Sequence, residues 1–157
     1  MVSLKNKSKG FTIVELLIVI VVIGILATLV IVTFSGIQQK ARNSKRQTDI
    51  QAVDSHVEAY KASSGNYPTF AQLTDVNWRS TNMKGLDPTA LVDPKGNSIA
   101  STAAAAGTYT YSYVATHDDG TTACSSTAVT IDDTLCTKFT LSANLEGNTT
   151  PYTKASN

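Results

Sequence analysis

The chain has 157 residues, with 13 Lys or Arg and 12 Asp or Glu, so its formal net charge is +1. This balance gives no global electrostatic reason to expect nucleic acid as the main partner. The length leaves room for one modest globular domain, and not for two, beyond an apolar N-terminal segment.

The apolar segment covers residues 11–34, and Glu15 is its only charged residue. As a helix it would be roughly 36 Å long, which is enough to cross a bilayer with some tilt. It is too long for the apolar core of a secretory signal, and no clear A-x-A cleavage site follows it. We therefore predict a retained transmembrane helix, preceded by a basic start at Lys5, Lys7 and Lys9.

The orientation of this helix is nearly balanced under the positive-inside rule. The basic start faces a second cluster on the far side, made of Lys40, Arg42, Lys45 and Arg46. The second cluster begins several residues beyond the membrane edge, and the domain that follows is rich in Ser and Thr. We therefore predict that the N-terminus is cytoplasmic and that the C-terminal domain is exported.

The sequence KGFTIVELL, which contains Gly10, Phe11 and Glu15, resembles the signature of type IV pilins and of the related pseudopilins of type II secretion. The resemblance implies a leader peptide at 1–10, cleaved between Gly10 and Phe11 by a membrane-embedded prepilin peptidase. The new amine of Phe11 would then be methylated. The apolar helix follows the cut, so it would remain as the polymerisation stem.

Glu15 is costly in hydrocarbon, at roughly 2.5–3.5 kcal/mol for an acid at a helix centre. The resemblance implies a salt bridge between Glu15 and the freed amine of Phe11 on a neighbouring subunit. An acid near a helix N-terminus also gains from the helix dipole. The alternative is a solitary glutamate that snorkels or stays protonated in an ordinary signal anchor.

The helix is predicted to continue without proline through 35–64, giving a length on the order of 80 Å. Ile50, Val53, Val57 and Tyr60 form an apolar stripe along its second half, while the first half is mostly polar. We favour a solvated face or inter-subunit ion pairs for the basic cluster at 40–46. A nucleic-acid or lipid-headgroup patch is the alternative, although no aromatic residues are interleaved with it.

Residues 65–157 are predicted to form an extracytoplasmic globular head. A short helix at Phe70–Leu73 would lie in an irregular segment, followed by strands at 108–115, 127–131 and 138–146. The expected fold class is α+β: the amphipathic half of the long helix packs on a small antiparallel sheet. The sequence AYKASSGNYPT, followed later by DPKG, resembles the major pseudopilin of type II secretion and its pilin relatives, and this resemblance implies the ladle fold of that family.

Cys124 and Cys136 are the only cysteines. In an exported domain we expect them to form one disulfide; two free thiols are the alternative, and a metal site has weaker support. The paired acids Asp118-Asp119 and Asp132-Asp133 could hold calcium, but they lack a calcium-loop spacing, so we expect turns. The segment at 148–150 is a sequon by pattern, and we expect a disordered terminus there.

These features predict a non-enzymatic structural subunit without a cofactor or metal, because no catalytic triad or clustered histidine site can be identified. The subunit would be stored in membrane lipid and would assemble into a homo-oligomeric filament. By resemblance, its partners would be the peptidase, an assembly ATPase and a platform protein. A pseudopilus subunit of type II secretion or DNA uptake is the main alternative, followed by a monomeric signal-anchored protein.

Overall fold

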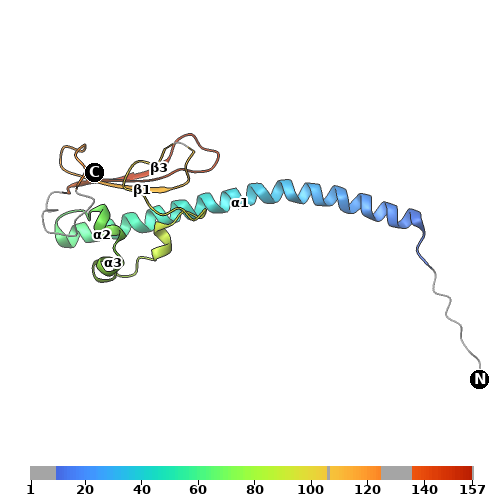
Figure 1. Cartoon of the computed structure of the whole chain (residues 1–157), viewed down its shortest axis with the longest axis horizontal. Helices are drawn as coiled ribbons and strands as arrows, with labels where there is room; N and C mark the ends of the chain where they lie inside the picture. Colours follow the sequence, from blue (N-terminus) through green and yellow to red (C-terminus); the bar gives the residue numbers. More distant parts are fainter. Residues whose placement is uncertain (1–9, 106, 125–135, 157) are drawn as a thin grey trace, which may run out of the picture. The chain divides into compact units, whose positions relative to one another are not determined.

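The structure is a computed structural model that describes residues 10–105, 107–124 and 136–156. It begins with one long helix and ends with a three-stranded sheet, as expected for the α+β class (Figure 1). The elements are α1 (Ile13–Ser64), α2 (Phe70–Thr74), α3 (Val76–Asn82), the 3-10 helix η1 (Pro88–Leu91), β1 (Tyr111–Thr116), β2 (Lys138–Ala143) and β3 (Tyr152–Ala155).

Internal contacts divide the chain into two compact units, Met1–Lys40 and Ala41–Asn157. The described part of the first unit contains the N-terminal portion of α1, whose apolar side chains make no core. Large apolar side chains from Phe11 to Ile37 are between 48% and 84% exposed. The segment is a long run without proline, so no residue in it interrupts the helical hydrogen bonding.

The second unit has its own hydrophobic core, and the later part of α1 contributes to it. Ile50, Val53 and Val57 are at most 1% exposed, which confirms the apolar stripe predicted on this helix. They belong to one cluster with buried side chains of the sheet, namely Tyr111, Tyr113, Phe139, Leu141 and Ala143. Here the helix is held by packing against the rest of its own chain.

The helix ends where the sequence indicates a stop. Gly65 has a φ of 91°, and its N–H donates to the carbonyl of Lys61 at 2.8 Å. A residue with a side chain would be strained in this left-handed conformation, so glycine suits the position after the helix.

The connection from α1 to the sheet is more regular than predicted. The helix expected at Phe70–Leu73 is present as α2, with Thr69 and Gln72 forming a capping box. However, α3 was not predicted; Asp75 caps it by accepting a hydrogen bond from the N–H of Trp78 at 2.6 Å. The ring of Trp78 packs edge-on against Tyr60, with 4.8 Å between ring centroids. The short helix was missed because seven residues carry too little periodicity to be recognised.

The sheet is an antiparallel meander in the order β1-β2-β3. Strand β1 pairs with β2 from Tyr111 opposite Ala143 to Thr116 opposite Lys138, which confirms two of the predicted strands. The third strand differs from the prediction: β3 pairs with β2, so part of the tail expected to be disordered is ordered. The strand predicted at 127–131 lies outside the described residues.

Candidate functional site

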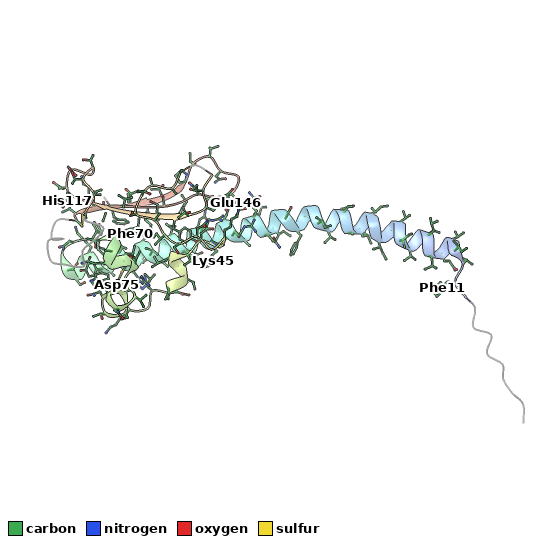
Figure 2. The ribbon with its side chains drawn as sticks, in the orientation of Figure 1. Phe11, Lys45, Phe70, Asp75, His117 and Glu146 are labelled. Carbon is green, nitrogen blue, oxygen red and sulfur yellow. A yellow bond between two sulfur atoms is a disulfide. The ribbon has the colours of Figure 1, made fainter. Side chains whose placement is uncertain are left out.

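The start of α1 holds the residues of the predicted processing and assembly site (Figure 2). The Glu15 carboxylate accepts hydrogen bonds from the Thr12 N–H at 2.8 Å and the Thr12 hydroxyl at 2.7 Å. The N–H of Glu15 in turn donates to the Thr12 hydroxyl oxygen at 3.2 Å. This reciprocal pair is a capping box, which satisfies donors that a helix N-terminus leaves free.

The geometry gives Glu15 a role within its own chain before any partner is present. Gly10 and Phe11 precede the first helical turn and are exposed, so the peptide bond between them is not protected by helical structure. Cleavage there, methylation of Phe11 and pairing of its amine with Glu15 remain predictions.

The apolar surface that follows is the most unusual feature of the first unit. Nearly every large side chain from Ile13 to Ile31 is exposed, whereas soluble monomers rarely expose contiguous apolar patches above a few hundred Å². The helix is long and apolar enough to cross a membrane. Such a surface can bind lipid or other apolar helices. Among the described residues, no group of three or more potential metal-ligating side chains comes together.

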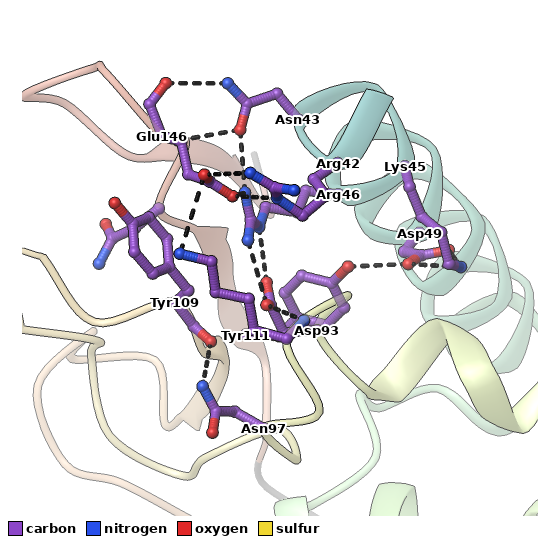
Figure 3. A network of polar contacts seen from close by, with 12 residues as sticks. Arg42, Asn43, Lys45, Arg46, Asp49, Asp93, Asn97, Tyr109, Tyr111 and Glu146 are labelled. Atoms are coloured by element: carbon purple, nitrogen blue, oxygen red, sulfur yellow. Dashed lines mark hydrogen bonds and ion pairs between the residues drawn. The ribbon is translucent and has the colours of Figure 1, made fainter. Parts of the chain in front are cut away.

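In the second unit, a network of polar contacts ties α1 to two distant loops (Figure 3). We call it the Glu146 cluster; its members are Arg42, Asn43, Arg46, Asp93 and Glu146. The Glu146 carboxylate accepts from Arg42 Nε at 2.7 Å, from Arg42 Nη2 at 2.8 Å and from Arg46 Nη1 at 2.9 Å. The main chain of Glu146 is also held, since its N–H and C=O both bond to the Asn43 side chain at 2.9 Å.

Arg46 lies at the centre of this cluster with its side chain fully buried. It donates from Nε to Asp93 Oδ2 at 2.6 Å and from Nη2 to Asp93 Oδ1 at 3.1 Å, so the pair is bidentate. Asp93 also accepts from the N–H of Lys95 at 2.8 Å, which fixes the turn at 93–97. The cluster therefore positions that turn and the connection from β2 to β3 on the same two turns of α1.

The electrostatics of the cluster follow from these contacts. Hydrogen bonds from Arg42 lower the pKa of Glu146 to about 2; those from Arg46 add to this effect, and partial burial opposes it. Burial by itself would lower the pKa of Arg46, but hydrogen bonds to Asp93 and Glu146 outweigh it and the net direction is upward. Arg42, Arg46 and Glu146 are therefore all charged in the folded protein at neutral pH.

The basic cluster at 40–46 was predicted to be a solvated face or to form inter-subunit ion pairs; Lys40 is exposed, but the other three cations pair within the chain. Arg42 and Arg46 pair within the chain, and Lys45 bonds to both carboxylate oxygens of Asp49 at 2.9 Å. Asp49 also accepts from the Tyr111 hydroxyl at 2.7 Å, and its negative charge and the burial of the ring raise the pKa of Tyr111. The prediction failed because the partners are up to 104 positions away in sequence.

The predicted cysteine pair is present as the disulfide Cys124–Cys136, whose Cα atoms are 6.0 Å apart. It closes the connection between β1 and β2. The N–H of Cys124 donates to the Ala115 carbonyl at 2.9 Å, and the carbonyl of Cys136 accepts from the N–H of Tyr67 at 2.8 Å. The disulfide therefore lies where the sheet meets the segment after α1.

Sequence reasoning missed Glu146 and Asp93 as structural residues, since an isolated acid in a loop carries no local signal. Asp119, predicted in a turn, accepts hydrogen bonds from the Thr122 hydroxyl and from the N–H groups of Thr121 and Thr122, and these bonds lower its pKa. Asp132 and Asp133 lie outside the described residues.

Comparisons with known proteins agree with the N-terminal signature. Residues 5–31 match the family model of the prokaryotic N-terminal methylation motif. The chain is 38% identical over 69 residues to the type II secretion system core protein G of Dickeya chrysanthemi, covering 44% of this chain and 45% of that protein. It is 40% identical over 67 residues to the protein of the same name from Escherichia coli strain K12, covering 43% and 46%.

A pilin is also among the relatives. Identity to the type IV major pilin protein PilA of Myxococcus xanthus is 32% over 65 residues, or 41% of this chain and 30% of that protein. The matches to the core proteins G span about half of their length. No solved structure shows a significant match to this chain.

Proposed function

We propose that this chain, which carries the prokaryotic N-terminal methylation motif at residues 5–31, is a structural subunit of a type IV pilus-like filament. The observation that carries the proposal is the exposed apolar surface of α1 from Ile13 to Ile31, headed by Glu15. A surface of this size requires lipid or other apolar helices around it. Membrane lipid would cover it in the stored monomer, and copies of the same helix would cover it in the filament.

Processing would prepare the subunit for this exchange. A prepilin peptidase would hydrolyse the bond between Gly10 and Phe11, remove the leader and methylate the new amine. The motif match and the exposure of these two residues support this step. Cleavage at this place requires the leader to be cytoplasmic, so the second unit would be on the opposite side of the membrane.

Assembly would then use two interactions of different kind. Burial of apolar helix surface between copies would supply the contact area. A salt bridge from Glu15 to the Phe11 amine of a neighbour would set the register. At 4 Å and an effective dielectric constant near 20, such a pair is worth about 4 kcal/mol before desolvation is subtracted. Because desolvation consumes much of this, the pair specifies position more than it adds stability.

The subunit would have no catalytic activity of its own. An assembly ATPase would supply the work of extracting it from the membrane, and a platform protein would present it to the growing filament. The second unit would face outward on the cell-surface filament.

A pseudopilus subunit of type II secretion or DNA uptake is the second candidate function. The specific observation in its favour is the identity of 38–40% to core proteins G, above the 32% to the pilin. Both candidates use the same stem chemistry. Microscopy at native expression separates them: long surface filaments support the pilus, whereas a secretion or DNA-uptake defect on deletion, without such filaments, supports the pseudopilus.

N-terminal sequencing of protein sheared from cells tests the shared core of the proposal. We expect sheared polymers whose chains begin with N-methylated Phe11. Chains that begin at Met1 and remain in the membrane fraction would instead support a monomeric signal-anchored protein and refute filament assembly.

A further inference from the structure

Arg79 is a buried cation without an acidic partner among the described residues. It lies in α3 (Figure 1), and only 8% of it is exposed. Among the described residues, the side chain of Arg79 donates one hydrogen bond, from Nη1 to the carbonyl of Leu73 at 2.6 Å. The carboxylates nearest in sequence are used elsewhere, since Asp75 caps α3 and Asp87 caps η1. Because no carboxylate pairs with it, the guanidinium must find its hydrogen-bond partners in the backbone, in solvent or in a ligand.

The contact with the C-terminal end of α2 uses only part of the hydrogen-bonding capacity of the Arg79 guanidinium. Leu73 is in the last turn of α2, where a cation can satisfy a free carbonyl. That contact uses one of five N–H donors. Among the buried side-chain atoms that the structure describes, only Thr137 Oγ1 lacks a hydrogen-bond partner. The remaining Arg79 nitrogens are therefore accessible to solvent rather than sealed in the core.

Arg79 lines a pocket of about 320 Å³ between α3 and η1. Its walls are apolar, formed by Val76, Met83, Leu86 and Pro88, with Arg79 and Lys84 as the charged members. Arg79 also lines a second pocket of about 210 Å³ on the side of Leu91 and Ile99. No carboxylate lines either pocket in the described part of the chain.

We propose that the pocket at Arg79 binds a carboxylate carried on a small apolar group. The planar guanidinium presents parallel N–H donors that match the two oxygens of a carboxylate. Lys84 adds a second positive charge at the rim, and the apolar walls accept the body of the ligand. The source of the carboxylate is either a free organic acid or the carboxyl terminus of a polypeptide. This inference is independent of the filament proposal, since it rests on the second unit alone.

The chain offers a direct probe for this site. It contains two methionines, Met1 in the leader and Met83 in the wall of the pocket. The full chain would be prepared in detergent micelles with 13C-labelled methionine methyl groups and followed by NMR. It would be titrated with benzoate and, as a neutral control, with benzamide. We expect a saturable shift of the Met83 methyl signal with benzoate and none with benzamide. Absence of a saturable shift, or an equal response to both compounds, would overturn the proposal.

Variants separate a binding role from a structural one. Arg79→Gln should weaken benzoate binding at least tenfold, whereas Lys40→Gln, an exposed cation outside the pocket, should leave it unchanged. Because Arg79→Gln removes a buried group and can prevent folding, Lys84→Glu is the second variant. Lys84 is exposed, so this change should preserve the fold and still abolish binding by repulsion. Unaltered affinity in Lys84→Glu would refute the site.

The probes also identify the source. N-acetylphenylalanine mimics a polypeptide carboxyl terminus; binding tighter than benzoate would assign the pocket to chain ends, and weaker binding would assign it to free acids. Inorganic phosphate should not displace benzoate at equal concentration. Displacement by phosphate would show that charge alone is recognised, which would overturn the carboxylate assignment.

Discussion

The two parts of α1 differ in where their side chains find partners. From Ile13 to Ile37 the large apolar residues are exposed, whereas Arg46, Ile50, Val53 and Val57 are at most 1% exposed within the second unit. Both parts are helical, so backbone hydrogen bonding does not distinguish them. The difference shows that the apolar side chains of the first part are not covered by the described residues of the chain, while those of the second are covered by its own loops and sheet.

The largest effect is expected from a change in the first part of α1, whose apolar side chains are exposed. Glu15→Val should abolish filament assembly, because the neighbour's Phe11 amine would lose its partner. Membrane insertion should be normal, since the change makes the segment more apolar. Sheared-filament yield and membrane-fraction content measure the two properties. Val19→Ile, an apolar change in the same segment, is the control and should assemble. Wild-type filament yield from Glu15→Val would exclude the pairing mechanism.

The next largest effect is expected in the second unit, which should be strongly destabilised when the buried Arg46–Asp93 pair is broken. Arg46→Ala leaves Asp93 buried and unpaired, which typically costs about 3–5 kcal/mol of unfolding free energy. Denaturant titration of the full chain, followed by fluorescence of the single tryptophan, Trp78, measures this. Lys40→Ala, an exposed cation on the same helix, should change stability by less than about 0.5 kcal/mol. Equal stability of the two variants would show that the cluster contributes nothing.

Removing the disulfide should have a somewhat smaller effect on the same unit. For a sequence separation of 12, the chain-entropy account predicts a loss of about 3 kcal/mol in the double variant Cys124→Ala, Cys136→Ala. Chemical reduction of the wild-type protein should lower the free energy of unfolding by a similar amount, which is seen as a lower denaturation midpoint. A midpoint unchanged by either treatment would contradict the prediction.

The smallest effect is expected in the pH dependence of the stability of the second unit, through Glu146. The pKa of Glu146 is lowered from 4.5 to about 2, so its stabilising contribution is complete above pH 4.5. It is lost as pH falls toward 2, and amounts to roughly 3 kcal/mol at most. Glu146→Gln should be less stable than wild type at pH 7, and the two stability curves should converge near pH 2. Parallel curves across this range would place the acid dependence elsewhere.

The features predicted correctly from the sequence depend on residues close together in the chain, whereas several of those that were missed depend on contacts between distant residues. The helix over the apolar run, the apolar stripe at 50–57 and strands β1 and β2 all have a local sequence pattern, and they were predicted correctly. Strand β3 was missed because four residues next to a polar turn resemble an ordinary tail. The partners of Arg42 and Arg46 were missed because contacts between distant loops leave no local pattern, and one sequence alone cannot link position 46 to 93 or 146.

The separation of 104 positions between Arg42 and Glu146 has a consequence for biosynthesis. A ribosome adding about 5–20 residues per second needs roughly 5–20 s to reach Glu146 after Arg42 has been made. Arg42 lacks its Glu146 partner throughout that interval, whereas Arg46 lacks Asp93 only until that residue, 47 positions away, has been made. If the chain is inserted into a membrane as proposed, the insertion machinery would therefore meet positive charges that are paired in the folded protein, and a topology decision based on charge would be taken on a nascent chain that differs from the finished one.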